Sequence, residues 1–363
     1  MDRRKLPLVA VMVALVLGGG CQDDAGPAPG ADPVPSTTPP TSATPAPAPG
    51  QQPSPARPVL DAAALPTGEP PHAPYAVSQN PAFGGGDWQL VRPDGSRQPF
   101  GHNPVLFVAY DDRVVNGYGA EGGFVVEVLD LAGKPLLDVP PLCQFALVTT
   151  PVRDQAAWLE EGSLVSVHSD GRVDTRPVAM PGGACGAARP VALQGSTLYV
   201  DGPRVRPSLV DGADAPVQVP LLRDLEDVTT RGTVIGTLDE KPSCSGLVSF
   251  RSVLEWRTCE DQLVSFAPGL YVLGLRGDID HTPFQGLVVH DRRDGQVRLE
   301  LDNAPRQRVN QVAWEDSEHL LLVVRSPVVG WSVVRVGVDD PPEYAVAPVH
   351  TATGFPPFRL QLS

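Results

Sequence analysis

The chain of 363 residues is 42% hydrophobic and only 19% charged, and it holds 42 prolines and 36 glycines. So much Pro and Gly argues against long helices and is typical of a chain with many turns. The formal net charge of −14 excludes a nucleic-acid partner, because phosphate contacts need clusters of Lys and Arg.

Residues 1–21 have the pattern of a bacterial export signal. A cationic start is followed by an apolar run from Leu6 to Leu17, which is too short for a transmembrane helix. Three glycines then precede Cys21, and small residues before a cysteine resemble the lipobox of bacterial lipoproteins. The resemblance implies that Cys21 is lipidated, as by palmitate, and that the exported chain sits on the outer face of the cytoplasmic membrane. A cleaved soluble form and an uncleaved anchor are the alternatives.

Residues 22–74 form a candidate linker. They hold sixteen of the prolines, together with many Ala, Thr, Ser and Gly residues. Such a segment buries too little apolar surface to offset its ordering entropy, so we expect a disordered spacer with polyproline character. Fully extended, it would reach on the order of 150 Å, which would lift a domain away from the membrane.

From residue 75 to residue 363 the chain reads as short strands and turns, and one pattern recurs about every forty residues. Each unit contains a β-rich segment, a turn and a returning strand, as in residues 163–178. Asp-Gly favours tight hairpins because the turn needs a positive φ. The seven marker turns are Asp94-Gly95, Ala132-Gly133, Asp170-Gly171, Asp211-Gly212, Arg251-Ser252, Asp294-Gly295 and Asp339-Asp340.

Two more strands fit before most of these hairpins, and four strands per forty-odd residues is the period of a propeller blade. Six complete blades fit between Pro104 and Ala347. A seventh would combine residues 358–362, as its innermost strand, with three strands between Tyr75 and Phe100, which would close the ring and remove a sheet edge. The sequence therefore predicts an all-β fold in residues 75–363, a seven-bladed β-propeller, with six or eight blades as alternatives.

Residues 313–324 read Ala-Trp-Glu-Asp-Ser-Glu-His-Leu-Leu-Leu-Val-Val, a segment similar to those of WD-repeat-like and TolB-type propellers. The resemblance covers residues 75–363 and rests on periodicity, because no His and Trp-Asp signature repeats. It implies a fold and names no activity.

Besides Cys21, the chain has four cysteines, which in an exported protein predict two disulfides. Cys244 and Cys259 lie symmetrically about the Arg251-Ser252 turn, so in a two-residue hairpin they would face each other. Cys143 and Cys185 occupy matching places in successive units and could join neighbouring inter-blade loops. Free thiols or a cysteine-bound metal are the alternatives.

No catalytic motif stands out. Residues 117–122 match G-x-G-x-x-G, but a strand-like segment follows where a nucleotide site needs a helix, so we interpret them as an inter-strand loop. The chain has no H-x-H, H-E-x-x-H or G-x-S-x-G motif, and its seven histidines are scattered.

The candidate ligand face follows from propeller topology, since loops joining the second and third strands share one face with the inter-blade loops. Clustered carboxylates there suit a hard cation such as Ca²⁺ or a basic partner, and the simpler interpretation is ordinary solvated loop charge. The candidates are Asp224, Glu226, Asp227, Asp239, Glu240, Asp278, Asp280 and His281.

Three functions compete. The leading hypothesis is a non-catalytic, membrane-anchored binding or scaffolding lipoprotein of the cell envelope, monomeric and without a cofactor, whose partner is an envelope protein or glycan. The second is a lactonase-type hydrolase that uses loop carboxylates and a metal. The third is a sensory module for a solute or glycan, which predicts exposed aromatic residues. All five tryptophans fall in predicted strands, which favours core packing over ligand stacking.

Overall fold

A computed structural model describes residues 57–81, 87–121, 123–137, 139–142, 147–181, 188–202, 205–240, 243–249, 251–276, 285–352 and 354–362. The chain divides into two units, Met1–Ser54 and Pro55–Ser363, and all described residues belong to the second. Several predictions fall outside the described residues: the export signal with Cys21, the linker up to residue 56, the Cys143–Cys185 bridge, and Asp278, Asp280 and His281.

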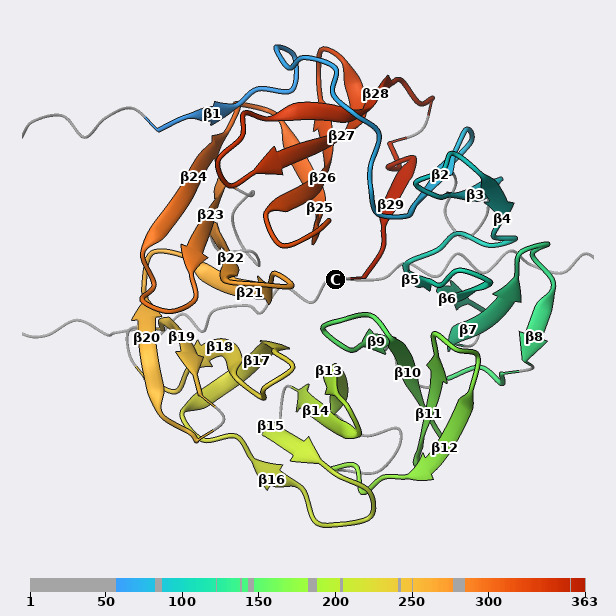
Figure 1. Cartoon of the computed structure of the whole chain (residues 1–363), viewed down its shortest axis with the longest axis vertical. Coiled ribbons are helices and arrows are strands. Elements are labelled where there is room, and N and C mark those ends of the chain that lie inside the picture. Colours follow the sequence, from blue (N-terminus) through green and yellow to red (C-terminus); the bar gives the residue numbers. More distant parts are fainter. Residues whose placement is uncertain are drawn as a thin grey trace, which may run out of the picture. The chain divides into compact units, whose positions relative to one another are not determined.

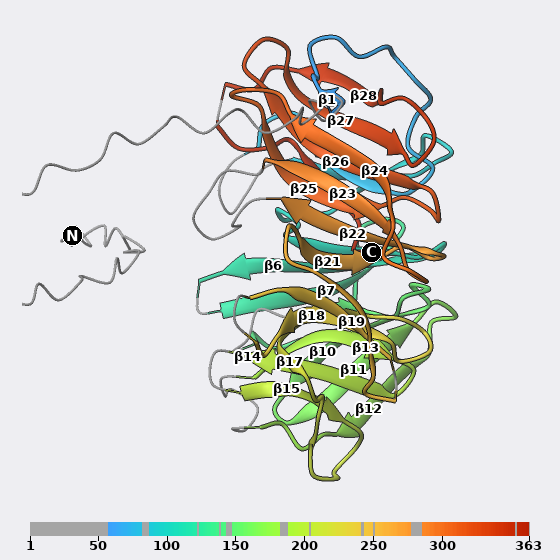
Figure 2. The same ribbon diagram turned by 90° about the vertical axis from the view of Figure 1, so that its left-hand side faces the viewer.

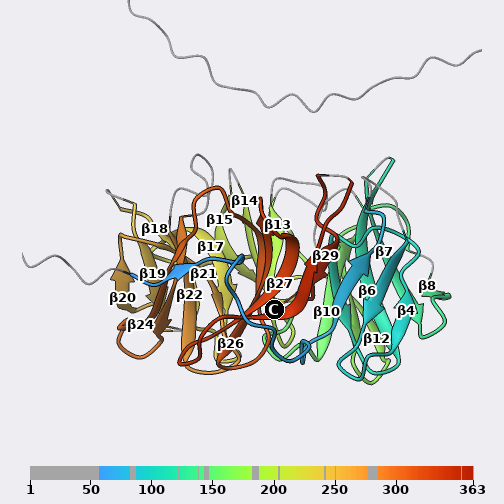
Figure 3. The same cartoon turned by 90° about the horizontal axis from the view of Figure 1, so that it is seen from above.

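Every regular element in the described residues is a β-strand, and these strands form seven sheets around a central axis (Figure 1). No described helix has the length and hydrophobicity needed to cross a bilayer. The strands run through the thickness of the ring, so their turns gather on its two faces (Figure 2, Figure 3). The predicted seven-bladed propeller is confirmed.

The first three blades contain four strands each, ordered from the axis outward. Blade 1 consists of β29 (Phe358–Leu360), β2 (Tyr75–Ser78), β3 (Trp88–Val91) and β4 (Arg97–Pro99); blade 2 of β5 (Leu106–Ala109), β6 (Arg113–Ala120), β7 (Gly123–Asp130) and β8 (Pro135–Leu137); blade 3 of β9 (Val148–Thr149), β10 (Gln155–Glu160), β11 (Ser163–His168) and β12 (Val173–Pro177).

The remaining blades follow the same order, and blade 6 carries an additional outer strand. Blade 4 consists of β13 (Arg189–Gln194), β14 (Thr197–Gly202), β15 (Val205–Val210) and β16 (Val217–Gln218); blade 5 of β17 (Leu222–Val228), β18 (Val234–Leu238), β19 (Ser245–Val248) and β20 (Leu254–Thr258); blade 6 of β21 (Gln262–Phe266), β22 (Tyr271–Arg276), β23 (Gly286–Asp291), β24 (Val297–Asn303) and β1 (Val59–Leu60); blade 7 of β25 (Arg308–Trp314), β26 (His319–Ser326), β27 (Gly330–Gly337) and β28 (Glu343–Val349).

The core lies between the blades, and β26 shows why its strands are apolar at consecutive positions. Leu320 and Leu322 face blade 6 and pack with Leu287, whereas Leu321 and Val323 face blade 1. Successive side chains of a strand point to opposite faces, so a blade covered on both sides needs apolar residues at every position.

The two ends of the ring meet in blade 1, as predicted. The innermost strand β29 comes from the C-terminal end of the chain and pairs with β2, with Tyr75 opposite Leu360 and Val77 opposite Phe358. This antiparallel pairing closes the ring, because it joins the two ends of the propeller segment within one blade.

Three-residue loops, rather than the expected two-residue turns, form several of the hairpins. At Asp170-Gly171 the amide of Gly171 donates to the carbonyl of His168 at 2.9 Å, and only the glycine has a positive φ, of 88°. The same geometry recurs at Gly95, Gly133 and Gly232, where glycine tolerates the left-handed backbone.

The Cys244–Cys259 disulfide is confirmed, with 4.2 Å between the two Cα atoms. The hairpin between these cysteines has a three-residue loop in which Ser252 has a φ of 60°. A bulge opposite Leu247 and Val248 restores the register, so that Ser245 still pairs with Thr258 next to the bridge.

Residues 117–122 belong mostly to a hairpin rather than to a loop. Gly117 and Gly119 lie within β6, which pairs with β7 along its whole length. A Cβ atom at Gly117 would collide with the ring of Phe124, so this glycine makes room for the core. The match to a nucleotide motif therefore has a packing explanation.

The boundary between linker and propeller differs from the expected residue 75. Residues 57–74, which we call the strap, run along blades 6 and 7 before they enter blade 1 (Figure 1). Within the strap, Leu60 and Ala62 are fully buried. An apolar patch in an otherwise Pro-rich segment thus docks on the propeller, because it has enough apolar surface to offset its ordering.

Candidate functional site

The strap is held by backbone pairing at the outer edges of two blades. β1 pairs in parallel with β24, with Val59 opposite Asp302. Farther along, Thr67 forms a parallel bridge with Tyr344 of β28, and the amide of Gly68 donates to the Tyr344 carbonyl at 2.9 Å. The strap therefore covers the edges of two outer strands that would otherwise lie open.

Side chains of the propeller form hydrogen bonds with the backbone amides and carbonyls of the strap. The Gln307 side chain accepts from the amide of Ala62 at 2.9 Å and donates to the carbonyl of Leu60 at 3.0 Å. The Tyr344 hydroxyl donates to the carbonyl of Ala62. Gln307 is only 6% exposed, so these contacts satisfy strap groups that water cannot reach.

Arg335 is the centre of the strap attachment. Its Nε and Nη2 donate to the two carboxylate oxygens of Glu315, at 2.6 and 3.0 Å, and its Nη1 donates to Glu343 at 2.7 Å. The same guanidinium donates to the strap carbonyls of Glu69 and Pro70, at 3.1 and 2.8 Å. The five contacts match the five N–H donors of a guanidinium.

The ion pair between Arg335 and Glu315 is almost completely buried, with side-chain exposures of 7% and 0%. Hydrogen bonding to Glu315, reinforced by Glu343, raises the pKa of Arg335 above its usual range. Glu315 also accepts from the backbone amide of His72. We call Arg335, Glu315, Gln307 and Tyr344 the strap clamp.

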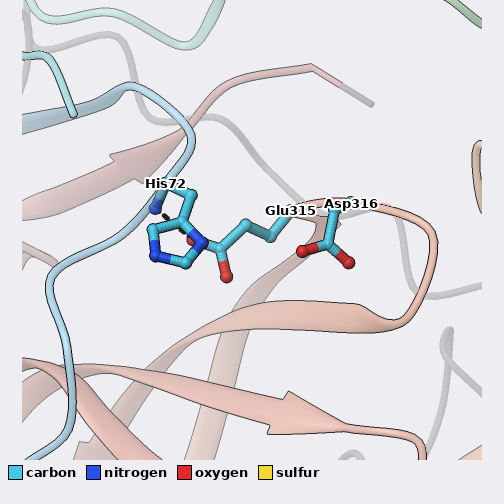
Figure 4. Close-up of side chains that lie close together, drawn as sticks. All are labelled: His72, Glu315 and Asp316. Atoms are coloured by element: carbon cyan, nitrogen blue, oxygen red, sulfur yellow. Dashed lines mark hydrogen bonds between the residues drawn. The ribbon is translucent and has the colours of Figure 1, made fainter.

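His72, Glu315 and Asp316 form the one group of possible metal ligands in the described residues, with donor atoms within 4.8 Å of one another (Figure 4). Both Glu315 oxygens are engaged by Arg335, and Asp316 accepts from His319 at 3.0 Å. A cation would have to compete with the guanidinium for Glu315, so the arrangement suits a clamp better than a metal centre.

The predicted carboxylates do not form one loop cluster. Asp224, Glu226 and Asp227 were expected in loops, but they lie in β17, the innermost strand of blade 5. The pairing of β17 with β18 contains two register shifts, and the buried residues of β17 are therefore spaced three positions apart. The alternation of buried and exposed residues that is typical of a strand is thus missing from the sequence. Gly236 of β18 allows this irregularity, because a Cβ atom there would collide with the Asp224 carbonyl oxygen.

The β17 carboxylates serve the packing between blades. Asp227 accepts from the amides of Phe266 and Val228, each at 2.7 Å, and Glu226 accepts from Gln262 at 3.0 Å. Burial raises the pKa of both carboxyl groups to about 7, although hydrogen bonds partly offset it. These contacts join blade 5 to blade 6, and three of the four carboxylate oxygens of Glu226 and Asp227 accept a hydrogen bond from the protein.

Asp239 and Glu240, the remaining predicted residues that the structure describes, are not part of the β17 carboxylate group. Asp239 and Glu240 do lie in the connection between β18 and β19, as expected, but each is paired with an arginine. Asp239 lies 2.8 Å from Arg206, and Glu240 lies 2.8 Å from Arg257. The pairs are solvent-exposed, which is typical of ordinary loop charge.

A half-buried arginine links blade 3 to blade 7. The guanidinium of Arg153, in the turn between β9 and β10 of blade 3, donates to the Trp314 carbonyl of blade 7 at 2.5 Å. Arg153 and Asp227 line a small pocket with a volume of about 10 Å³, which holds one water molecule at most. Burial lowers the pKa of Arg153.

The strap and the strap clamp were absent from the predicted site. Two signals could have revealed them. One is the apolar stretch Val59–Leu65 within the Pro-rich segment, and the other is Arg335 within the otherwise apolar strand β27. A charged residue inside a buried strand calls for a partner, and Glu315 follows the buried Trp314.

No protein-family model and no curated protein matches the chain. Among solved structures, one of two prolyl endopeptidases is 11% identical, with a TM-score of 0.51 over 78% of this chain and 51% of that one. The propeller domain of Cps50 (Swd1) from Myceliophteria thermophila is 10% identical, with a TM-score of 0.44 over 69% and 86% of the two chains. BamB from Moraxella catarrhalis is 10% identical, with a TM-score of 0.38 over 66% and 73%. The resemblance to WD-repeat-like and TolB-type propellers is therefore one of fold alone.

Proposed function

We propose that this chain is a non-catalytic binding or scaffolding lipoprotein of the bacterial cell envelope, anchored by a lipid on Cys21. The export pattern of residues 1–21 and the Pro-rich composition of the linker support the anchor. The propeller then acts as a rigid platform at the end of a tether.

The strap clamp is the observation that carries the proposal. A tether that pulls on Arg57 loads β1, whose main chain is paired with β24 and is held by Gln307 farther along. The buried pair of Arg335 and Glu315 supports the strap at a second place. A domain that is suspended by its N-terminal side benefits from such an attachment, because the load is spread over two blades.

The chemistry of the described residues supports binding rather than catalysis. The buried carboxylates of β17 are used by backbone amides and by Gln262, which disfavours the metal-dependent hydrolase. Four of the five tryptophans are at most 5% exposed, and Trp256 donates to the Arg292 carbonyl at 2.8 Å, which disfavours an aromatic glycan platform.

Metabolic labelling with an alkyne analogue of palmitate, followed by membrane fractionation, tests the anchor. The wild-type chain should incorporate label and sediment with membranes, and Cys21→Ser should do neither. Cys259→Ser controls for the loss of a cysteine and should keep the label. A soluble, unlabelled wild-type chain would contradict the lipoprotein proposal.

A further inference from the structure

An open groove that is lined by both apolar and polar side chains lies between blades 2 and 3. Leu137 and Val139 of blade 2 form one wall, Trp158 and Val165 of blade 3 form the floor, and the volume is about 370 Å³. Val173 on the outer strand β12 also lines the groove and is 42% exposed. We call this feature the blade 2–3 groove.

The floor of the blade 2–3 groove includes an unsatisfied donor. Trp158 is fully buried, and its indole N–H has no acceptor among the described residues. Buried donors are normally paired, so an unsatisfied indole N–H in a residue that lines the groove is compatible with a ligand that brings it a carbonyl acceptor once the Trp158 side chain adjusts.

The strap shows what occupies the corresponding place between blades 6 and 7. There β1 adds a strand to the outer edge of β24, and Leu60 and Ala62 pack against side chains of both blades, including Leu301 and Val334. Blade 2 is built like blade 6, and β8 is its outer edge, as β24 would be without β1. The blade 2–3 groove therefore corresponds to the site between blades 6 and 7 that the strap occupies, but no strap fills it in the described residues.

The negative charge around the blade 2–3 groove indicates which kind of segment can bind there. Glu160, which is half-buried, and Glu161, which is exposed, also line the groove and form its acidic rim. The chain's own segment 22–56 contains three aspartates and no Lys or Arg, and the strap carries Asp61 and Glu69 against a single Arg57. A second copy also has a net charge of −14, so neither the linker nor another copy complements the rim.

We propose that the blade 2–3 groove binds an extended, basic segment of a partner protein by β-strand addition. The segment pairs with the outer edge of β8, places small aliphatic side chains against Trp158 and Val165, and sets Lys or Arg beside Glu160 and Glu161. The proposal rests on the binding role inferred above and names the class of partner.

Two labelled peptides test it against the purified full-length protein in detergent. The first, Lys-Val-Leu-Lys-Ala-Ala-Ala-Leu-Lys, copies the strap sequence Val59–Leu65 between lysines and replaces Asp61 with lysine. The second replaces every lysine with aspartate. Fluorescence anisotropy should show binding of the basic peptide, with a Kd below about 1 mM, and at least about tenfold weaker binding of the acidic one.

Three variants locate the binding. Thr175→Arg places a cation at an exposed position of β12 in the groove. It should weaken binding of the basic peptide about tenfold or more. Gln218→Arg makes the same change on β16, outside the groove, and should leave binding unchanged. Glu161→Asn removes a rim charge at a position with a φ of 47°, which Asn tolerates, and should weaken binding without loss of stability.

Equal binding to the wild-type protein and to Thr175→Arg would overturn the proposal, as would absence of binding at about 1 mM peptide. Tighter binding of the acidic peptide would assign the groove to the chain's own linker or to a second copy, and would also overturn it. None of these results depends on lipidation, so the anchor and the groove fail independently.

Discussion

The guanidinium of Arg335 and the carboxylate of Glu315 form a buried ion pair with a 2.6 Å contact, and both groups also hold the main chain of the strap. Strand β27 and the residue that follows β25 thus attach to blade 7 a segment that lies more than 240 residues earlier in the chain. The pair joins the end of the linker to the ring.

Replacing only one residue of the Arg335–Glu315 pair should lower the free energy of unfolding more than replacing both residues. Arg335→Met leaves the Glu315 carboxylate buried without a counter-charge, so the free energy of unfolding should fall by about 3–5 kcal/mol. The double variant Arg335→Met/Glu315→Met should lose less. Urea denaturation gives the energies, and limited proteolysis near residue 68 reports release of the strap. Arg257→Met, which breaks the exposed pair with Glu240, is the control and should change stability by less than about 1 kcal/mol.

The Cys244–Cys259 disulfide should stabilise the outer hairpin of blade 5. The two cysteines are 15 residues apart, and a closed loop of this size contributes about 3 kcal/mol in the chain-entropy model. Cys244→Ser/Cys259→Ser should lower the free energy of unfolding by about that amount without a reductant. Under a reductant the variant and the wild-type protein should differ little, and a difference that persists would mean that the serines themselves disturb the packing. Whether Cys143 and Cys185 are bridged stays a prediction for thiol titration.

Titration of His290 should make the stability of the protein decrease as the pH rises above about 6.5. Its Nε2 lies 2.6 Å from Asp261, and both side chains are about 5% exposed. Burial lowers the pKa of His290, but the Asp261 carboxylate more than offsets this, so the pKa is raised overall. The contribution of the pair is complete below the unfolded pKa of about 6.5 and disappears as the pH rises through the folded pKa. His290→Gln should flatten this part of the stability curve, which urea denaturation at a series of pH values measures.

Glu226 should make stability decrease in a lower pH window. Its pKa is about 7 in the folded protein, because of burial, against an ordinary value near 4.5. The folded state therefore holds the proton more tightly, and stability falls as the pH rises from about 4.5 to about 7. Glu226→Gln keeps an acceptor for Gln262 and should be about 1–2 kcal/mol more stable than the wild-type protein at pH 8, after allowance for partial exposure. No gain at pH 8 would contradict the raised pKa.

At position 153, a glycine variant should be more stable than an alanine variant. It has a φ of 57° at a turn position where Gly95, Gly133, Gly171 and Gly232 occupy the sister turns. Arg153→Gly should therefore be about 1 kcal/mol more stable than Arg153→Ala, because alanine is strained in a left-handed backbone. Ser252→Gly provides the matched control and should stabilise the protein slightly, since Ser252 has a φ of 60°. Thermal unfolding measures all three variants.

Local patterns were sufficient to predict the architecture. Turn residues at a fixed period, and strands that are apolar at consecutive positions, are consequences of stacking similar sheets around an axis. The same reasoning identified the strand at Phe358–Leu360 as the closure of blade 1 and paired Cys244 with Cys259, because both depend only on spacing along the chain.

The details of the site depended on contacts between distant segments. Asp227 looks like a loop carboxylate until two bulges place it in the innermost strand, where it accepts from the amide of Phe266 in the next blade. The strap looks like linker until Leu60 and Ala62 meet the gap between blades 6 and 7. Spacing along the chain therefore determined how many blades there are and how they close. Only the packed ring decided which charges are buried and where the tether is held, because burial and pairing arise from neighbours that are far apart in sequence.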